Sequence, residues 1–136
     1  MNNSKNRLHK VFFYGLYMDE DILKSKGVEP RNKQLAKAKA YKLRIGKMAT
    51  LLRDENSEAY GIVYSLTYEE IDKLYKNAGL VDYVAEAILV ETFDKKEIAT
   101  LTCILLNPPA KNEKNDTYFE SLVECMKKYK LPLPIL

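Results

Sequence analysis

The chain has 136 residues, of which 46% are hydrophobic and 30% charged, a balance typical of a folded globular domain rather than of a disordered chain. Its net charge is +3, and the 22 lysines and arginines are scattered singly or in pairs, which argues against nucleic acid as a partner. His9 is the only histidine, which excludes histidine-based metal clusters and Ser-His or Cys-His catalytic pairs within one chain.

The apolar stretches and the cysteines indicate in which cellular compartment the protein is expected. The stretch Ile98 to Leu106 is interrupted by threonines and is far shorter than the ~20 apolar residues of a membrane-spanning helix, so it predicts a core strand. Met1 to Lys10 contains no apolar signal segment, and we expect a cytoplasmic protein without membrane contact. Cys103 and Cys125 have apolar neighbours and are interpreted as buried thiols rather than as a disulfide or a redox pair.

The first predicted strand runs from His9 to Tyr14, after a leader, 1–8, that we expect to be flexible. The strand stops at Gly15, where the backbone freedom of glycine allows a turn. The acidic residues Asp19 to Asp21 come just before apolar residues. They predict the first turn of a short helix, whose dipole they complement.

The next elements are predicted to be strands. Gln34 to Gly46 alternates small apolar with basic residues, the period-two pattern of a strand with one solvated face. Ala49 to Arg53 and Ala59 to Leu66 are predicted as the two strands of a hairpin, joined by the turn-forming residues Asp54 to Ser57. Gly61 interrupts an otherwise bulky strand, so we expect a Cβ at this position to collide with a neighbouring element.

A capped helix and a second hairpin follow. Thr67 and Glu70 form a capping-box signature, which predicts a helix from about Tyr68 to Ala78 that stops at Gly79. Two further strands are predicted at Tyr83 to Phe93 and Glu97 to Asn107.

The end of the chain predicts one more helix and a tail. Tyr118, Phe119 and Leu122 belong to the apolar face of that last helix. The apolar, proline-containing segment Leu131 to Leu136 is expected to dock against the body of the protein.

This order of elements, together with several local strings, resembles the γ-glutamylcyclotransferase-like family. Phe13 to Met18 is similar to the family's Tyr-Gly turn, and Ala59 to Leu66 to its glycine-containing strand. Tyr118 and the segment Lys130 to Pro132 resemble its last helix and Leu-Pro tail. The resemblance implies one α+β domain over 1–136, a small mixed β-barrel with flanking helices, whose pocket lies at the loop after the first strand.

The resemblance also implies a reaction that needs neither metal nor cofactor. In that family the α-amine of the substrate attacks its own γ-carbonyl, which releases 5-oxoproline and an amine. The enzyme supplies alignment and one general acid/base, a glutamate. Backbone N–H groups of the loop would hold the glutamyl carboxylate of a small-molecule ligand. The ligand-binding residues implied are Tyr14, Gly15, Leu16, Tyr17, Met18, Ala78, Tyr83 and Tyr118.

The sequence departs from the family pattern at two positions. Ala78 stands where the family has its catalytic glutamate, and Leu16 replaces a small hydroxyl residue of the loop. Alanine cannot carry a proton. Asp82 is the nearest carboxylate in sequence and is the candidate substitute acid/base; its alternative interpretation is a solvated loop acid. For the candidate pocket tyrosines, half-buried packing is the alternative interpretation.

Three hypotheses therefore stay open. In the first, the protein keeps a pocket for a γ-glutamyl or other amino-acid-derived ligand, but its catalysis is weak or altered because of Ala78. In the second, it is an active 5-oxoproline-forming enzyme that uses Asp82 for proton transfer. In the third, the barrel is the scaffold of a non-catalytic interaction module.

Overall fold

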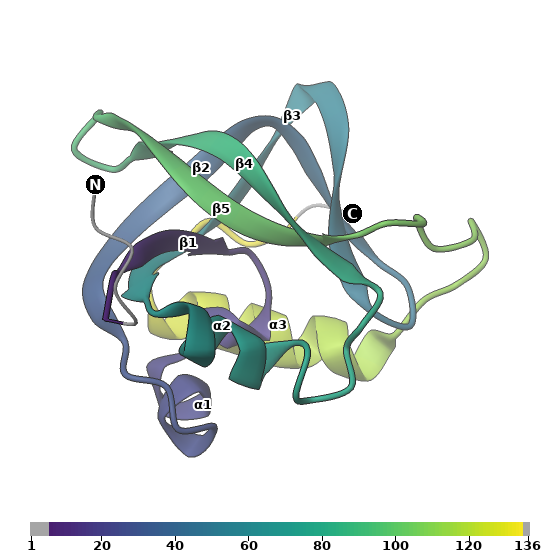
Figure 1. The fold of residues 1–136 in the computed structure, drawn as a ribbon. Helices are drawn as coiled ribbons and strands as arrows, with labels where there is room; N and C mark the ends of the chain where they lie inside the picture. Colours follow the sequence, from purple (N-terminus) through teal and green to yellow (C-terminus); the bar gives the residue numbers. More distant parts are fainter. Residues whose placement is uncertain (1–5, 135–136) are drawn as a thin grey trace.

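The computed structural model describes residues 6–134 and shows a five-stranded barrel with three α-helices beside it (Figure 1). The expected flexible leader lies largely outside this range, as do residues 135 and 136 of the tail. The elements in chain order are β1 (His9–Phe13), the 3₁₀ turn η1 (Leu16–Met18), α1 (Glu20–Ser25), β2 (Arg31–Ile45), β3 (Ala49–Leu66), α2 (Tyr68–Leu74), β4 (Tyr83–Thr92), β5 (Glu97–Leu105) and α3 (Asp116–Lys128).

The barrel is closed and mixed, in the strand order β1-β3-β2-β4-β5. Four of the strand pairs are antiparallel, and β1 pairs in parallel with β5 at Val11 and Leu101. The helices lie on the side of the barrel where β1 runs, so β1 has the barrel interior on one face and helices on the other (Figure 1). The predicted α+β barrel with flanking helices is confirmed.

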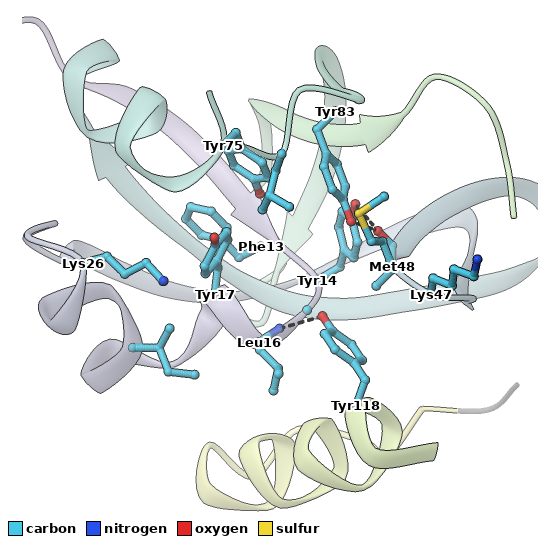
Figure 2. A pocket seen from close by; sticks show the side chains of 14 residues that line it. Phe13, Tyr14, Leu16, Tyr17, Lys26, Lys47, Met48, Tyr75, Tyr83 and Tyr118 are labelled. Atoms are coloured by element: carbon cyan, nitrogen blue, oxygen red, sulfur yellow. Dashed lines mark hydrogen bonds between the residues drawn. The ribbon is translucent and has the colours of Figure 1, made fainter. Parts of the chain in front are cut away.

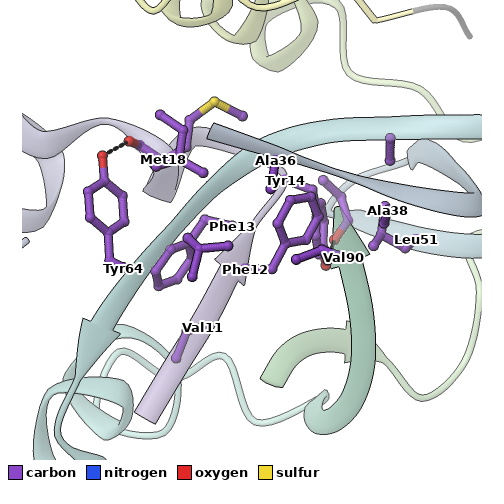
Figure 3. Close-up of a cluster of buried hydrophobic side chains, with 14 of the residues drawn as sticks. Val11, Phe12, Phe13, Tyr14, Met18, Ala36, Ala38, Leu51, Tyr64 and Val90 are labelled. Carbon is purple, nitrogen blue, oxygen red and sulfur yellow. Dashed lines mark hydrogen bonds between the residues drawn. The ribbon is translucent and has the colours of Figure 1, made fainter. Parts of the chain in front are cut away.

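The hydrophobic core joins the barrel interior to the helices (Figure 3). Tyr64 is completely buried, and its hydroxyl donates a hydrogen bond of 2.7 Å to the carbonyl of Met18, which ties β3 to η1. Each fully buried side chain of this size stabilises the fold by about 1.5–3 kcal/mol relative to exposure. The largest fully buried side chains are Tyr64, Phe12, Met18, Leu23, Ile62, Leu66, Leu74, Leu122 and Met126.

The predicted hairpin between Arg53 and Ala59 is wrong. Residues 49–66 form one continuous strand of 18 residues, β3, and the hairpin partner of β3 is β2. Asp54 to Ser57 do form a local turn, in which the Asp54 carboxylate accepts bonds from the Asn56 N–H and the Ser57 hydroxyl, both at 3.0 Å. This turn is a bulge opposite Ala40, whose φ is +65°, so the chain bends there without reversing.

Helix α2 has the predicted capping box, with Thr67 and Glu70 each bonded to the other's backbone N–H. It ends at Leu74 rather than at Ala78, because Asn77 and Gly79 are poor helix formers. Turns follow instead, and Gly79 adopts a φ of +79° that favours glycine. The connection from α2 to β4 therefore begins at Tyr75.

The predictions for Gly61 and for the cysteines are confirmed. A Cβ built on Gly61 would lie 2.1 Å from the carbonyl oxygen of Phe13, so only glycine fits between β3 and β1. Cys103 and Cys125 are both buried, free thiols. The tail docks only in part: Leu131 is buried and its N–H donates to the carbonyl of Met126 at 2.9 Å, whereas Pro132 and Leu133 are exposed. No helix within residues 6–134 is long and apolar enough to cross a membrane.

Candidate functional site

A cavity of about 350 Å³ opens at the end of β1 (Figure 2). Five segments form its walls: the loop after β1, helix α1 with the residue that follows it, the turn between β2 and β3, the segment from the end of α2 to the start of β4, and α3. Its lining residues are Phe13, Tyr14, Gly15, Leu16, Tyr17, Ile22, Lys26, Lys47, Met48, Ala49, Tyr75, Leu80, Tyr83 and Tyr118.

The loop after β1 is positioned by α3. The N–H of Leu16 donates a hydrogen bond of 3.1 Å to the hydroxyl of Tyr118, and the N–H of Met18 bonds the carbonyl of Gly15 at 3.0 Å. Within residues 6–134, the N–H groups of Gly15 and Tyr17 have no acceptor. These two donors are therefore available in a loop that borders the cavity.

Gly15 has a different role from the one expected. Its φ of −119° and ψ of −157° are ordinary extended values, so a left-handed turn is not the reason for glycine. A Cβ built here would lie within 2.3 Å of the Tyr118 hydroxyl oxygen. Glycine is needed because this hydroxyl approaches the backbone closely.

Four aromatic rings form one wall of the cavity, which we call the ring wall: Phe13, Tyr17, Tyr75 and Tyr83. Phe13 meets Tyr17 edge-to-face with ring centroids 6.3 Å apart, and Tyr17 meets Tyr75 in the same way at 5.5 Å. Tyr75 and Tyr83 are tilted, at 5.3 Å. Such pairs contribute about 0.5–1.5 kcal/mol each beyond the area that they bury, so the wall is a fixed apolar surface.

Backbone carbonyls hold three of the tyrosines in place. The hydroxyl of Tyr17 donates to the Leu74 carbonyl at 2.7 Å, that of Tyr83 to the Ala49 carbonyl, and that of Tyr14 to the Cys103 carbonyl. Burial raises the pKa of each of these phenols above its usual value of 10.0. They stay neutral at physiological pH and cannot serve as bases.

Tyr118 is arranged differently from these three tyrosines. Its oxygen accepts the bond from Leu16, and no acceptor for its own hydroxyl hydrogen is present among the described residues. Burial again raises the phenol's pKa, despite the opposing effect of the hydrogen bond from Leu16. Tyr118 is therefore a neutral side chain that can donate a hydrogen bond into the cavity.

The charged lining residues are both cations. Lys26 and Lys47 lie on opposite sides of the cavity (Figure 2). No aspartate or glutamate from residues 6–134 lines it, and 1–5 and 135–136 contain neither residue type. In the same described range, no group of three or more His, Cys, Asp or Glu side chains could hold a metal ion.

The structure brings six of the residues proposed from the sequence to this cavity: Tyr14, Gly15, Leu16, Tyr17, Tyr83 and Tyr118. Met18 is completely buried in the core and does not line the cavity. Ala78 is an exposed residue of the turn after α2, and it does not line the cavity either. Leu80, two residues further along, does.

Asp82, the candidate acid/base, is exposed and lies outside this cavity. It lines a separate hollow of about 320 Å³ together with Lys47 and Met48. Because Lys47 and Met48 line both spaces, the turn between β2 and β3 is their shared wall.

Sequence reasoning missed Tyr75, which belongs to the ring wall. Its place on the apolar stripe of the helix predicted for residues 68–78 indicated a core side chain, and that pattern does not distinguish a core tyrosine from one that faces a cavity. Lys26 and Lys47 were also missed, because each belongs to a different segment and only the folded chain brings them to one cavity.

Neither a protein-family model nor a curated protein sequence matches the chain. Solved structures do. A γ-glutamyl cyclotransferase superposes with a TM-score of 0.73 at 20% identity, over 93% of this chain and 83% of the other. An uncharacterized protein of Homo sapiens gives 0.71 at 21% identity, over 94% and 83%. A glutathione-specific γ-glutamyl cyclotransferase from yeast gives 0.65 at 12% identity, over 96% and 90%. At these identities the likeness shows a shared fold.

Proposed function

On this γ-glutamylcyclotransferase-like fold, we propose that the chain binds a γ-glutamyl or related amino-acid-derived ligand in the ring-walled cavity, and that its cyclotransferase activity is weak or altered. The observation that carries the proposal is the cavity itself, which has two lysines and two backbone donors at its border but no aspartate or glutamate from residues 6–134. In this proposal the partner is a small molecule, the protein is cytoplasmic, and no metal or cofactor takes part.

Binding would begin with the ligand's carboxylate. The N–H groups of Gly15 and Tyr17 and the hydroxyl of Tyr118 are unused donors around one loop, and hydrogen bonds to an ionised acceptor are stronger than neutral ones. Lys26 and Lys47 add positive charge on both sides. The volume of about 350 Å³ lies at the lower end of the range for small-molecule sites.

Turnover would need a group that this cavity lacks. When the α-amine attacks the γ-carbonyl, a proton has to move from the attacking nitrogen to the leaving nitrogen. A positioned acid/base contributes about 10² to 10⁴ in rate to such a step. Ala78 stands at the position of the family's glutamate by resemblance, and the cavity tyrosines have pKa values raised by burial. The reaction is therefore expected to be slow.

The test is release of 5-oxoproline from γ-glutamyl dipeptides and γ-glutamylamines, alongside thermal-shift measurements with the same compounds and with 5-oxoproline. We expect a thermal shift with little turnover. Ala78→Glu restores the family residue, and Leu80→Glu places a carboxylate at a residue that already lines the cavity. Either gain should appear mainly in kcat, because proton transfer is the deficient step. Val81→Glu, on an exposed neighbour outside the cavity, is the matched control.

Two results would favour the other hypotheses. Robust turnover by the unaltered protein that disappears in Asp82→Asn would assign the acid/base role to Asp82 and contradict the proposal. Absence of both turnover and ligand-induced thermal shift would leave the interaction module as the explanation.

A further inference from the structure

We propose that the cavity selects anions that carry no ammonium group and that have a ring-sized apolar body. The ligand class is an amine-blocked amino-acid derivative, such as a lactam or an N-acylated amino acid, in preference to a zwitterion. This inference rests on the proposed function, because it uses the same cavity and the same carboxylate contact, and it names the ligand's charge pattern.

The first argument is the balance of charge around the cavity. Neither Lys26 nor Lys47 forms an ion pair with a carboxylate within residues 6–134, although the charge of Lys47 also lowers the pKa of Glu113. The carboxylate of Glu113 is near Lys47, but it accepts bonds from the backbone N–H groups of Lys47 at 3.2 Å and Ala110 at 2.8 Å. It lines the neighbouring hollow rather than this cavity. A ligand's carboxylate would be attracted here, and its ammonium would be repelled.

The second argument concerns hydrogen-bond acceptors. An ammonium group brings three donors and a full charge, and both lose hydration when the group enters a cavity. The carbonyls of Leu74 and Ala49 already accept bonds from Tyr17 and Tyr83, and no carboxylate among the lining residues could pair the charge. The nitrogen of a lactam or of an N-acylated amino acid has at most one hydrogen and no charge. Blocking the amine therefore removes the group for which this cavity offers the fewest hydrogen-bond acceptors and no opposite charge.

The third argument is the apolar ring wall. Its three consecutive ring pairs present fixed aromatic surface on the side of the cavity formed by β1, η1, the residue after α2 and the start of β4 (Figure 2). Leu80 and Met48 add aliphatic surface. A small ligand without an apolar group would leave this aromatic surface in contact with water. An aromatic or branched apolar group on the ligand would cover it.

Isothermal titration calorimetry on the full chain at neutral pH tests the inference with ligands matched in all but one group. N-acetylphenylalanine has the carboxylate and the ring without an ammonium; phenylalanine restores the ammonium; N-acetylphenylalanine amide removes the carboxylate. We expect the Kd of N-acetylphenylalanine to be at least tenfold lower than that of either of the other two. Lys26→Gln and Lys47→Gln should each raise it several-fold, whereas Lys76→Gln, on an exposed lysine outside the cavity, should not.

A second matched pair separates this inference from the proposed function. If γ-glutamylphenylalanine binds as tightly as its N-acetyl derivative or more tightly, the proposed function stands and the charge selection is overturned. Equal affinity for phenylalanine and N-acetylphenylalanine overturns the inference in the same way. If γ-glutamylphenylalanine, its N-acetyl derivative, N-acetylphenylalanine and 5-oxoproline all fail to bind, the proposed function fails as well.

Discussion

The hydroxyl of Tyr118 lies 3.1 Å from the backbone nitrogen of Leu16 and accepts its hydrogen bond, so the last helix holds the loop that follows the first strand. The two residues are 102 positions apart in the chain. The contact depends on Gly15, which leaves space for the Tyr118 oxygen. Helix α3 thereby belongs to the candidate site although most of its apolar residues belong to the core.

Tyr118→Phe should weaken ligand binding as well as stability. The change removes the acceptor for the Leu16 N–H together with a hydroxyl hydrogen that has no acceptor among residues 6–134, and we expect a loss of about 1 kcal/mol in the free energy of unfolding. Tyr129→Phe is the matched control, because its hydroxyl accepts a similar bond from the Glu20 N–H at 2.8 Å outside the cavity. Urea unfolding and calorimetric titration with N-acetylphenylalanine measure the two effects. Equal loss of affinity in both variants would contradict a direct role for Tyr118.

Gly61→Ala should destabilise the barrel by about 1–3 kcal/mol, because the new methyl group would lie 2.1 Å from the Phe13 carbonyl and force β1 and β3 apart. Gly79→Ala provides the comparison. No heavy atom lies within 4 Å of a Cβ there, but its φ of +79° is unfavourable for alanine, by about 1 kcal/mol. In thermal unfolding, the melting temperature of Gly61→Ala should therefore be well below that of Gly79→Ala. The reverse order would show that the contact with β1 relaxes easily.

Glu70 should make the stability depend on pH in the acid range. Burial raises its pKa, but hydrogen bonds from Arg31 and from the N–H groups of Glu29 and Thr67 outweigh burial, so the pKa falls below the usual 4.5. The unfolded chain then binds the proton more readily. The ionised form stabilises the fold above pH 4.5, and this contribution is lost as pH falls through the lower pKa of the folded state.

Glu70→Gln therefore should lower stability by about 1.5–3 kcal/mol at pH 7. The difference from the unaltered protein should shrink as pH falls below 4.5, as measured by urea unfolding at a series of pH values. Glu69→Gln, on the exposed neighbour, should leave the pH profile unchanged. If the two proteins differed in free energy of unfolding by the same amount at every pH, the packing of the Glu70 side chain rather than its charge would explain its role.

The cysteines should resist alkylation in the folded protein. Burial raises the pKa of Cys103 to about 11 and that of Cys125 to about 12, and only the thiolate reacts with iodoacetamide. At pH 8 both should react slowly in buffer and rapidly in concentrated urea, as followed by mass spectrometry. Fast modification of one cysteine in buffer would reveal an opening of the core around it.

The local elements could largely be predicted from the sequence, because their signals act over a few residues. The capping box of α2 and the crowding at Gly61 are examples. The hairpin at Asp54 could not. Its turn chemistry is real, but whether such a turn reverses the chain or forms a bulge depends on the partner strand, and β2 pairs on both sides of it.

For the candidate site, local sequence was enough to predict that the loop Tyr14 to Tyr17 follows an apolar strand, and it shows that Ala78 has no ionisable side chain. Which side chains share the cavity depends on how the whole chain folds. The fold placed Tyr75 and Leu80 inside, left Ala78 and Asp82 outside, and brought Lys26 and Lys47 to opposite sides. Closure of the barrel brings segments that are far apart in the chain to the same end of the barrel. The direction of a side chain that follows a helix depends on turns, and turns have no periodic sequence pattern.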